Sequence, residues 1–324
     1  MNFVFHRKVH FQGVLEFTNH CPRNCLFCRR RRKTMICPGS GSTGSRSGGA
    51  CELGYRMGIR SFLLQGGEDH YYTDMIMCNL LRNLQQQFPD CALGLSIGER
   101  SRQSYHRLHQ AGAQRYFLSF QTADPLHFSR LHPPTHALST KIACFNDLKD
   151  LGYETDTGFL VGAPYEQVEY LVRDLTLLQE LAPHSITLIP FLPEEGTPFY
   201  QQDRMALEEY LRLTAVLRIL FPRANIVAPW SIRRIHAHGQ ILSVQSGPMC
   251  CGCPWRLRPG LKTEPGRPEK NAPYGGSHVP VPEELRLCLD PGPGGFPAVS
   301  PPGGGSPAGS PGRAQTGRGG NSRN

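Results

Sequence analysis

The sequence has no uninterrupted apolar run approaching the roughly 20 residues that a helix needs to cross a bilayer. Its N-terminus, MNFVFHRKVHF, has neither a long apolar stretch nor a cleavage site of small residues, so a secretory signal peptide is not indicated. We therefore expect a protein of the reducing cytoplasm with no membrane partner. In that compartment the twelve cysteines are expected to bind metal or take part in chemistry rather than to pair as disulfides.

The sequence also lacks the aromatic residues, interleaved with basic ones, on which nucleic-acid bases stack. The formal net charge is +9, but much of it lies in Arg29 to Lys33 and in the last third of the chain. A basic total of this kind is weak evidence for a polyanionic partner. We expect no nucleic-acid partner.

Short apolar runs alternate with longer amphipathic ones between residues 13 and 229, which is typical of repeated βα units. Strands are expected at 13–17, 61–65, 92–97, 115–120, 155–162 and 185–192, with a seventh candidate at 225–229. Helices are expected at 72–88, 101–113, 139–152, 167–182 and 206–221. Several strands end in Gly, polar or charged residues, as in QGGED, SIGER, SFQTAD and VGAP. We expect the active face at these carboxyl ends.

This pattern predicts an α/β fold, a TIM-type (βα) barrel that is incomplete and has about six βα units. Such a barrel fits the pattern better than a doubly wound sheet. The expected organisation is a lead-in over residues 1–10, a core barrel over 11–229 and a low-complexity, disordered tail over 230–324.

Two segments depart from the βα pattern. Residues 36–50, ICPGSGSTGSRSGGA, fall where the first helix of the barrel is expected, yet their composition predicts an irregular Gly/Ser-rich insert. From Trp230 onward the periodicity fades, and the Gly- and Pro-rich end of the chain is unable to bury a core. Two explanations stay open. The tail is either natural and disordered, or it follows a reading frame lost near residue 230, with two compensating shifts around residues 36–50.

Three cysteines follow the first predicted strand within NHCPRNCLFCRRRR. Cys21, Cys25 and Cys28 have the spacing C-x3-C-x2-C. Three thiolates from one loop can hold three irons of a [4Fe–4S] cluster and leave the fourth iron open. A structural zinc site needs four protein ligands, and His20 is awkwardly adjacent to Cys21. A zinc site is therefore the weaker alternative, and a disulfide is weaker still.

This loop carries a family resemblance. C-x3-C-x-aromatic-C after the first strand resembles the signature of the radical S-adenosylmethionine (SAM) superfamily. In that family the three cysteines bind a [4Fe–4S] cluster, and SAM binds the open iron. The resemblance implies both cofactors here, with Cys21, Cys25 and Cys28 as the metal ligands. It also implies SAM-binding roles for Phe27, for Gln65, Gly66, Gly67 and Glu68 in LQGGED, and for Val161 in GFLVGAP.

A closer resemblance extends over about residues 11–229. The segments ACELGYRMGIRSFLLQGGED, AGAQRYFLSFQTADPLHFSRLHPP and LKDLGYETDTGFLVGAP are similar to the HydE maturases of FeFe-hydrogenases, which are related to biotin synthase and methylornithine synthase. The resemblance implies an enzyme that cleaves SAM reductively to a 5′-deoxyadenosyl radical. It implies an external electron donor, a ferredoxin or a flavodoxin-like protein, and other hydrogenase maturases as partners. By this resemblance the chain is truncated before His10.

Several positions depart from that group. The resemblance places Gln121 where a SAM-binding Glu is expected, and Lys141 where an Arg pairs with the SAM carboxylate. Lysine is a point charge without the two-pronged geometry of arginine. Gly94 and Ser119 stand at substrate-anchoring positions, and Ser96 and Thr122 are further candidates for substrate contact. Two alternatives to a HydE role stay open: a paralogue that acts on an amino acid, and a degraded, non-catalytic iron–sulfur protein.

The remaining cysteines and histidines carry weaker signals. MCCGCPW at 249–255 is a candidate for an accessory cluster, although adjacent cysteines rarely form one. Glu99 and Arg100 either position a substrate or cap the next helix. Core positions are expected for Cys37, Cys51, Cys78, Cys91 and Cys144. Surface or ordinary polar roles, rather than metal ligation, are expected for His106, His109, His127 and His132.

Overall fold

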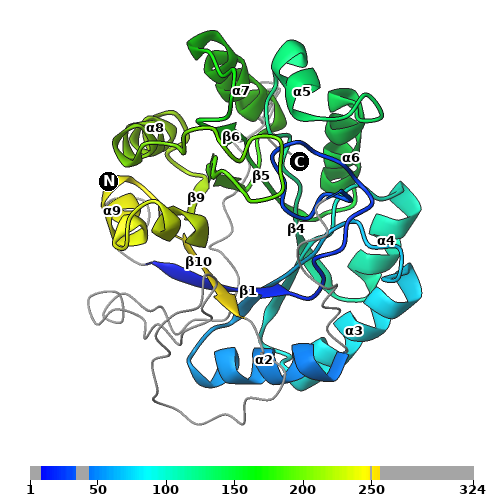
Figure 1. Cartoon of the computed structure of the whole chain (residues 1–324). Helices are drawn as coiled ribbons and strands as arrows, with labels where there is room; N and C mark the ends of the chain where they lie inside the picture. The colour runs from blue at the N-terminus through cyan, green and yellow to red at the C-terminus, as the bar shows by residue number, and fades with distance from the viewer. Residues whose placement is uncertain (1–8, 34–43, 249, 256–324) are drawn as a thin grey trace, which may run out of the picture.

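The structure is a computed structural model that describes residues 9–33, 44–248 and 250–255. Eight parallel strands close a barrel, and Figure 1 shows the helices arranged around its outside. In order around the barrel the strands are β1 (His10–Glu16), β2 (Ser61–Gln65), β3 (Ala92–Ser96), β4 (Ala113–Phe117), β5 (Glu154–Thr157), β7 (Ser185–Thr187), β9 (Asn225–Ala228) and β10 (Cys250–Trp255). The expected TIM-type α/β barrel is confirmed.

The outer layer consists of helices that alternate with the strands. They are α2 (Gly44–Arg56), α3 (Asp74–Gln87), α4 (Arg102–Gln110), α5 (Pro125–Leu131), α6 (Leu138–Asp150), α7 (Val168–Leu181), α8 (Leu207–Leu220) and α9 (Gly239–Ser246), with a 3-10 helix, η1 (Trp230–Arg234). Thr73 and Ser101 cap α3 and α4 through their side chains. The seven-residue α5 begins at a proline behind the cap Asp124, and it is too short for helical periodicity to predict it.

The main hydrophobic core lies between the strands and the helices. Phe62, Leu64, Leu93 and Leu95 alternate along β2 and β3 and belong to one buried cluster with helix residues. The intervening strand positions face the barrel interior, because side chains of a strand alternate between its two faces. There the Arg115 guanidinium donates to Ser61 Oγ at 2.9 Å. The interior therefore holds polar side chains.

The structure corrects the expected incomplete barrel and the expected start of the tail at residue 230. β10 pairs with β1 over residues 250–255 and with β9 over Cys250 and Cys251, which closes the barrel. Its sequence contains glycine and proline, which are disfavoured within strands, so local pattern did not predict it. A reading frame lost at residue 230 is at odds with a segment that completes the barrel. The rest of the expected tail, 256–324, lies outside the described residues.

The Gly/Ser-rich insert expected at 36–50 is also corrected. Residues 44–50 form the first half of α2. Residues from the middle of the helix onward supply the reason: Ala50 and Cys51 are buried against the barrel, and Arg56 pairs with Glu52 one turn away. The earlier part of the insert lies outside the described residues.

Two strands expected to be continuous are each divided. The segment 155–162 contains β5 and then β6 (Leu160–Val161), and 185–192 contains β7 and then β8 (Ile189–Pro190). β6 and β8 form a separate two-stranded sheet beyond the barrel. Between the two halves, a Cβ on Gly158 would lie 1.8 Å from the Thr187 carbonyl oxygen. Only glycine permits this close approach of the two chains.

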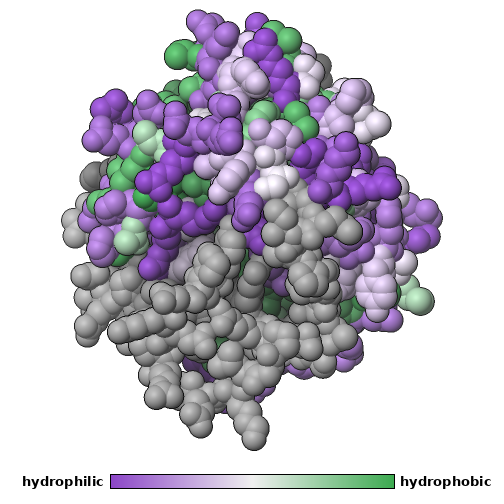
Figure 2. All heavy atoms as spheres, viewed as in Figure 1, coloured by the Kyte–Doolittle hydropathy of each residue, from purple (hydrophilic) through white to green (hydrophobic). Residues whose placement is uncertain are grey.

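The surface carries two further features. Figure 2 shows apolar side chains among the hydrophilic ones over α7 and α8, where Val172 and Ile219 are exposed. None of the helices within the described residues combines the length and the apolar character that crossing a membrane demands.

Candidate functional site

The candidate site lies at the carboxyl end of β1, where a loop of residues 17–33 carries the three spaced cysteines. The Leu26 N–H donates to the carbonyl of Leu131 at the end of α5, at 2.9 Å, so the loop is attached to the opposite part of the barrel wall. The Arg32 N–H donates to the Arg23 carbonyl at 2.8 Å and folds the loop back on itself. Figure 1 shows this dark-blue loop near α6.

Cys21, Cys25 and Cys28 are all partly buried, and none is in a disulfide. Burial, with smaller contributions from the neighbouring Cys28 and Cys21, raises the pKa of the Cys25 thiol to about 12. Burial also raises the pKa of Cys21. The buried thiols of Cys21 and Cys25 are therefore difficult to ionise without a cation. A positively charged iron–sulfur cluster would supply that compensation, because coordination deprotonates a thiol.

The turn after β2 is packed directly against this loop. The Gly66 N–H donates to the Ser96 carbonyl at 3.0 Å, which ties the ends of β2 and β3 together. A Cβ on Gly67 would lie 2.1 Å from the His20 carbonyl oxygen and 2.6 Å from Cys21 Cβ. Gln65, the last residue of β2, shares the inward face with Leu63 because it lies two residues further along the strand. The predicted Gly-Gly segment therefore does lie beside the cysteine loop.

A row of alternating charges crosses the mouth of the barrel. Glu68 accepts from Arg23 Nε at 2.6 Å, and an Arg23 terminal nitrogen lies 3.4 Å from Glu99. Glu99 is also 3.0 Å from the Lys141 ammonium on α6, and both of these side chains are largely buried. Glu99 therefore belongs to this charge row, and Ser101 rather than Glu99 caps α4.

Phe27 lies over a small apolar cluster that includes Leu131, Leu160 and Phe191. Its ring contacts the edge of the His132 ring, with the ring centroids 5.5 Å apart. Val161, predicted to contact SAM, is fully buried in a different cluster, whereas its neighbour Leu160 faces the Phe27 side. The alternation along β6 explains this difference.

Gln121 has an unusual backbone and an orphaned side-chain oxygen. Its φ is 63°, in the left-handed region, and its buried Oε1 has no hydrogen-bond partner among the described residues. Its N–H donates to Ser119 Oγ at 3.2 Å, and Ser119 Oγ donates to the Gly158 carbonyl at 2.7 Å. Thr122 is fully buried and interacts with Asp174 of α7. The hydroxyls of Ser119 and Thr122 are thus already engaged within the protein, unlike Gln121 Oε1.

Gly94 and Ser96 occupy the inward face of β3. A Cβ on Gly94 would lie 3.2 Å from Leu63 Cδ1 and 3.3 Å from Arg115 Cβ, so a side chain there would crowd the interior. Further along the interior, Asp156 accepts from Thr187 Oγ1 at 3.2 Å. Burial raises the pKa of Asp156 to about 7, and the positive charge of Arg115 opposes that rise.

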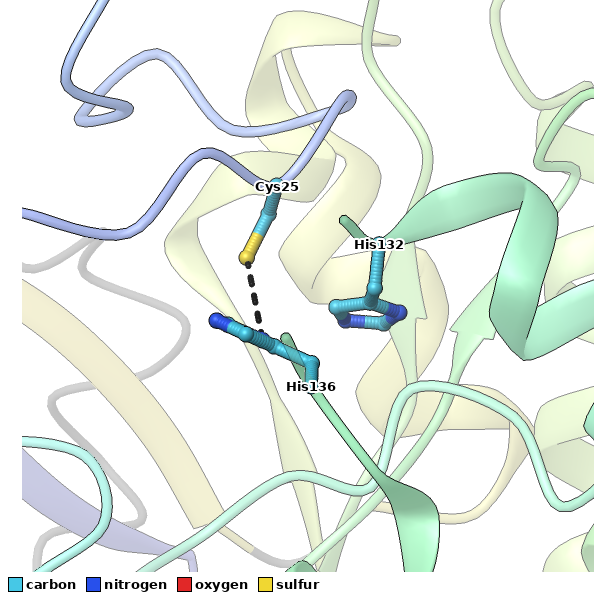
Figure 3. A group of neighbouring side chains, drawn as sticks. All are labelled: Cys25, His132 and His136. Atoms are coloured by element: carbon cyan, nitrogen blue, oxygen red, sulfur yellow. Dashed lines mark hydrogen bonds between the residues drawn. The ribbon is translucent and has the colours of Figure 1, made fainter. Parts of the chain in front are cut away.

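Two histidines approach the cysteine loop, as Figure 3 shows. His136 Nδ1 is 3.9 Å from Cys25 Sγ, and His132, at the end of α5, lies beside both. Burial lowers the pKa of His132 to about 3 and that of His136 to about 4, so both rings are neutral. An ordinary polar role was expected for His132, and His136 was not among the candidate residues. The spacing His-x3-His, with His132 directly after a helix, is the sequence signal that could have identified this pair.

The other cysteine expectations have mixed outcomes. Core positions are confirmed for Cys51, Cys78, Cys91 and Cys144, and Cys37 lies outside the described residues. MCCGCPW was only a weak candidate for an accessory cluster, and the first two of its cysteines offer it little support. Cys250 and Cys251 are consecutive buried residues of β10 and point to opposite faces of the strand, so they are unable to share one metal ion.

Comparisons with known proteins agree with this geometry. Residues 15–178 match the family model described as the radical SAM superfamily. The [FeFe] hydrogenase maturase subunit HydE of Thermotoga maritima is 32% identical over 240 residues, which covers 74% of this chain and 68% of that protein. A biotin synthase of Desulforudis audaxviator is 29% identical over 52% of this chain and 51% of its own length.

Solved structures show the same fold. The crystal structure of methylornithine synthase (PylB) covers 78% of this chain and 73% of its own, with a TM-score of 0.72 and 20% sequence identity. The hydrogenase maturase HydG covers 78% of this chain and 58% of its own, with a TM-score of 0.67 and 16% identity. At these identities the likeness establishes the barrel architecture alone.

Proposed function

Because this chain belongs to the radical SAM superfamily, whose enzymes use a [4Fe–4S] cluster and SAM, we propose that Cys21, Cys25 and Cys28 hold that cluster. The observation that carries the proposal is the convergence of three partly buried cysteines on one loop at the carboxyl end of β1, where burial raises the thiol pKa of Cys21 and of Cys25. Three protein ligands leave one iron open for SAM. When bound, the reduced cluster supplies the electron that splits SAM into methionine and the 5′-deoxyadenosyl radical.

The residues around the loop have complementary roles in binding SAM. The row Glu68, Arg23, Glu99 and Lys141 presents both signs of charge, which suits the ammonium and carboxylate of a methionine group. Gly66 and Gly67 let the backbone approach closely. The orphaned Oε1 of Gln121 is an acceptor for a ligand donor, since buried acceptors without partners are rare. Phe27 offers an apolar wall, together with Leu160, for an aromatic ring.

For the biological role, we propose a HydE-type maturase in the assembly of the FeFe-hydrogenase active site. The support is the 32% identity to a HydE protein over 240 residues. This role requires an external donor of electrons, a ferredoxin or a flavodoxin-like protein, in a reducing cytoplasm. It also implies cooperation with other hydrogenase maturases.

A second candidate is a paralogue that acts on an amino acid. The observation that favours it is the charge inside the barrel, where Arg115 and Asp156 line the wall below Gly94 and Ser96. A zwitterionic or otherwise charged substrate would find partners there. The third reading, a degraded and non-catalytic iron–sulfur protein, rested in part on a scrambled first helix and on missing last strands, and α2 and the closed barrel argue against these two grounds.

Anaerobic reconstitution with iron and sulfide, followed by measurement of 5′-deoxyadenosine, tests the activity. The wild-type chain should bind a cluster and release 5′-deoxyadenosine when SAM and a reductant are supplied. Cys25→Ala should lose both properties, whereas Cys91→Ala, in the core, should keep them. Full iron content and SAM cleavage in Cys25→Ala would overturn the assignment.

The biological role has its own test. Addition of the purified chain to a cell-free hydrogenase maturation mixture that lacks only HydE should restore hydrogenase activity. Failure there, together with normal SAM cleavage and faster 5′-deoxyadenosine release on addition of one amino acid, would favour the paralogue.

A further inference from the structure

We propose that the chain without its cluster has a mononuclear Zn²⁺ site formed by Cys25, His132 and His136. This site does not rest on the proposed radical chemistry. It competes with that chemistry, since the cluster and the single ion both require the Cys25 thiolate.

The geometry of the three side chains carries the proposal. The Sγ of Cys25 and one ring nitrogen of each histidine all lie within 4.8 Å of one another. The separation between Cys25 Sγ and His136 Nδ1 is 3.9 Å. Bonds of about 2.3 Å to sulfur and about 2.0–2.1 Å to nitrogen, at a tetrahedral angle, place the two ligand atoms about 3.6 Å apart. A contraction of a few tenths of an ångström therefore brings Cys25 Sγ and His136 Nδ1 to the separation that a shared ion requires.

The hydrogen bonding of His132 supplies a second, independent observation. Its Nδ1 lies 3.0 Å from the Phe128 carbonyl, so Nδ1 carries the hydrogen and Nε2 keeps its lone pair. That Nε2 is buried and has no hydrogen-bond partner in the described part of the chain, and the residue is only 3% exposed. A histidine that donates one ring N–H to a carbonyl and presents the other nitrogen unpartnered is the arrangement found in metal ligands.

Packing holds the two rings in place. The His132 ring is stacked on Phe128 at a centroid distance of 4.0 Å and on His136 at 5.6 Å. The backbone N–H of His136 donates to the Pro133 carbonyl at 3.0 Å, which fixes the turn that carries this second ring. Figure 3 shows Cys25 and the two rings converging from the first loop and from the α5–α6 connection.

The ligand set selects the class of metal. One thiolate and two imidazoles, with a fourth position left for water, are typical of Zn²⁺, and Co²⁺ takes the same geometry. Cys21 and Cys28 are not part of the set. The consequence is a chain that, when zinc binds first, is blocked from assembling a cluster on Cys25.

Anaerobic titration of the cluster-free chain with Co²⁺ tests the site, because a tetrahedral Co²⁺–thiolate complex has intense visible bands and a near-ultraviolet charge-transfer band. One equivalent of Co²⁺ should produce both, and Zn²⁺ should displace it. His136→Ala and His132→Ala should each weaken Co²⁺ binding by at least about tenfold, and Cys25→Ala should remove the charge-transfer band. Cys21→Ala, Cys28→Ala and His127→Ala should bind Co²⁺ as the wild type does.

The same variants separate this site from the proposed cluster. Cys21→Ala and Cys28→Ala should lose the [4Fe–4S] cluster and keep Co²⁺, whereas His136→Ala should keep the cluster and lose Co²⁺. His136 is partly exposed, so its replacement is expected to leave the fold intact, which the melting temperature checks. Absence of the thiolate band in the wild type, loss of Co²⁺ in Cys21→Ala or Cys28→Ala, or wild-type Co²⁺ affinity in His136→Ala would overturn the proposal. None of these outcomes depends on SAM cleavage.

Discussion

Arg23 Nε donates to Glu68 Oε2 at 2.6 Å, and this contact joins the cysteine loop after β1 to the turn after β2. The same guanidinium reaches Glu99 after β3 at 3.4 Å. One side chain thus connects three successive βα loops at the mouth of the barrel. If it were removed, Glu68 would lose this ion-pair partner and Glu99 would keep only Lys141.

Arg23→Gln is expected to weaken SAM binding about tenfold, which corresponds to roughly 1.4 kcal/mol. The reason is that Glu68 would lose the cation that holds it, which would disturb the adjacent turn that contains Gly66 and Gly67. Equilibrium binding of SAM to the reconstituted protein measures the effect. Arg56→Gln, which breaks an exposed pair with Glu52, is the matched control. Unchanged SAM affinity in Arg23→Gln would contradict a role for the charge row.

Gly67→Ala is expected to lose most of its cluster while keeping the barrel. The new Cβ would lie 2.1 Å from a backbone oxygen of the cysteine loop, and backbone does not yield as the end of a side chain does. Iron content after reconstitution, compared with the circular dichroism spectrum, separates the two effects. Gly252→Ala is the control, since its Cβ would meet only Val14 Cγ2, at 3.7 Å. Equal iron content in the two variants would show that the loop adapts.

Cys251→Ala is expected to keep the full iron content of the wild type. This cysteine is 1% exposed and belongs to the core between β10 and the helices, so its replacement should cost on the order of 1 kcal/mol of stability. Cys28→Ala should show the reverse behaviour, with little change in stability and no cluster. Iron analysis and thermal unfolding provide the two measurements. Loss of iron in Cys251→Ala would indicate that this cysteine is a ligand of an accessory cluster.

Asp156→Asn is expected to flatten the decline of stability with rising pH. Burial raises the pKa of Asp156 from 3.8 to about 7 in the folded chain, so the folded state holds this proton more tightly than the unfolded state. The stability that the neutral carboxyl contributes is fully present below about pH 4 and is lost as the pH rises through about 7. The variant should therefore gain on the wild type between about pH 4 and pH 7, by about 1.4 kcal/mol for each pKa unit removed, with no further gain above that range.

Denaturant unfolding of the two proteins at each pH provides the comparison. Burial also raises the pKa values of Glu166 to about 7 and of Asp174 to about 8, so the wild-type slope has several sources and only the difference isolates Asp156. Asp150→Asn, at an exposed carboxylate, serves as the control. Parallel pH profiles for Asp156→Asn and the wild type would mean that this carboxyl is better solvated than its position indicates.

Much of the barrel was predictable because its strands and helices carry strong local patterns. SFLLQ is predicted and observed over the same residues, Ser61–Gln65. β10 was not predictable, because Gly252 and Pro254 weaken its propensity and only pairing with β1 and β9 specifies a strand there. The first half of α2 was missed for a similar reason, since its Gly and Ser residues are helical only next to the buried second half.

The candidate site was likewise predictable only where it rests on local sequence features. The spacing of Cys21, Cys25 and Cys28 within one loop, and the Gly-Gly turn after the second strand, are local features that the sequence displays directly. The sequence does not display the side-chain direction of Val161, because that direction depends on how β6 is placed in the folded chain.

The sequence by itself determined the cysteine loop, the order of the βα units and hence the family, since each rests on residues close together in the chain. Only the tertiary structure decided which distant groups meet that loop. His136 is 111 residues from Cys25, and closure of the barrel brings their side chains to 3.9 Å. No local spacing encodes such a contact, because it arises from the summed packing of all the intervening strands and helices.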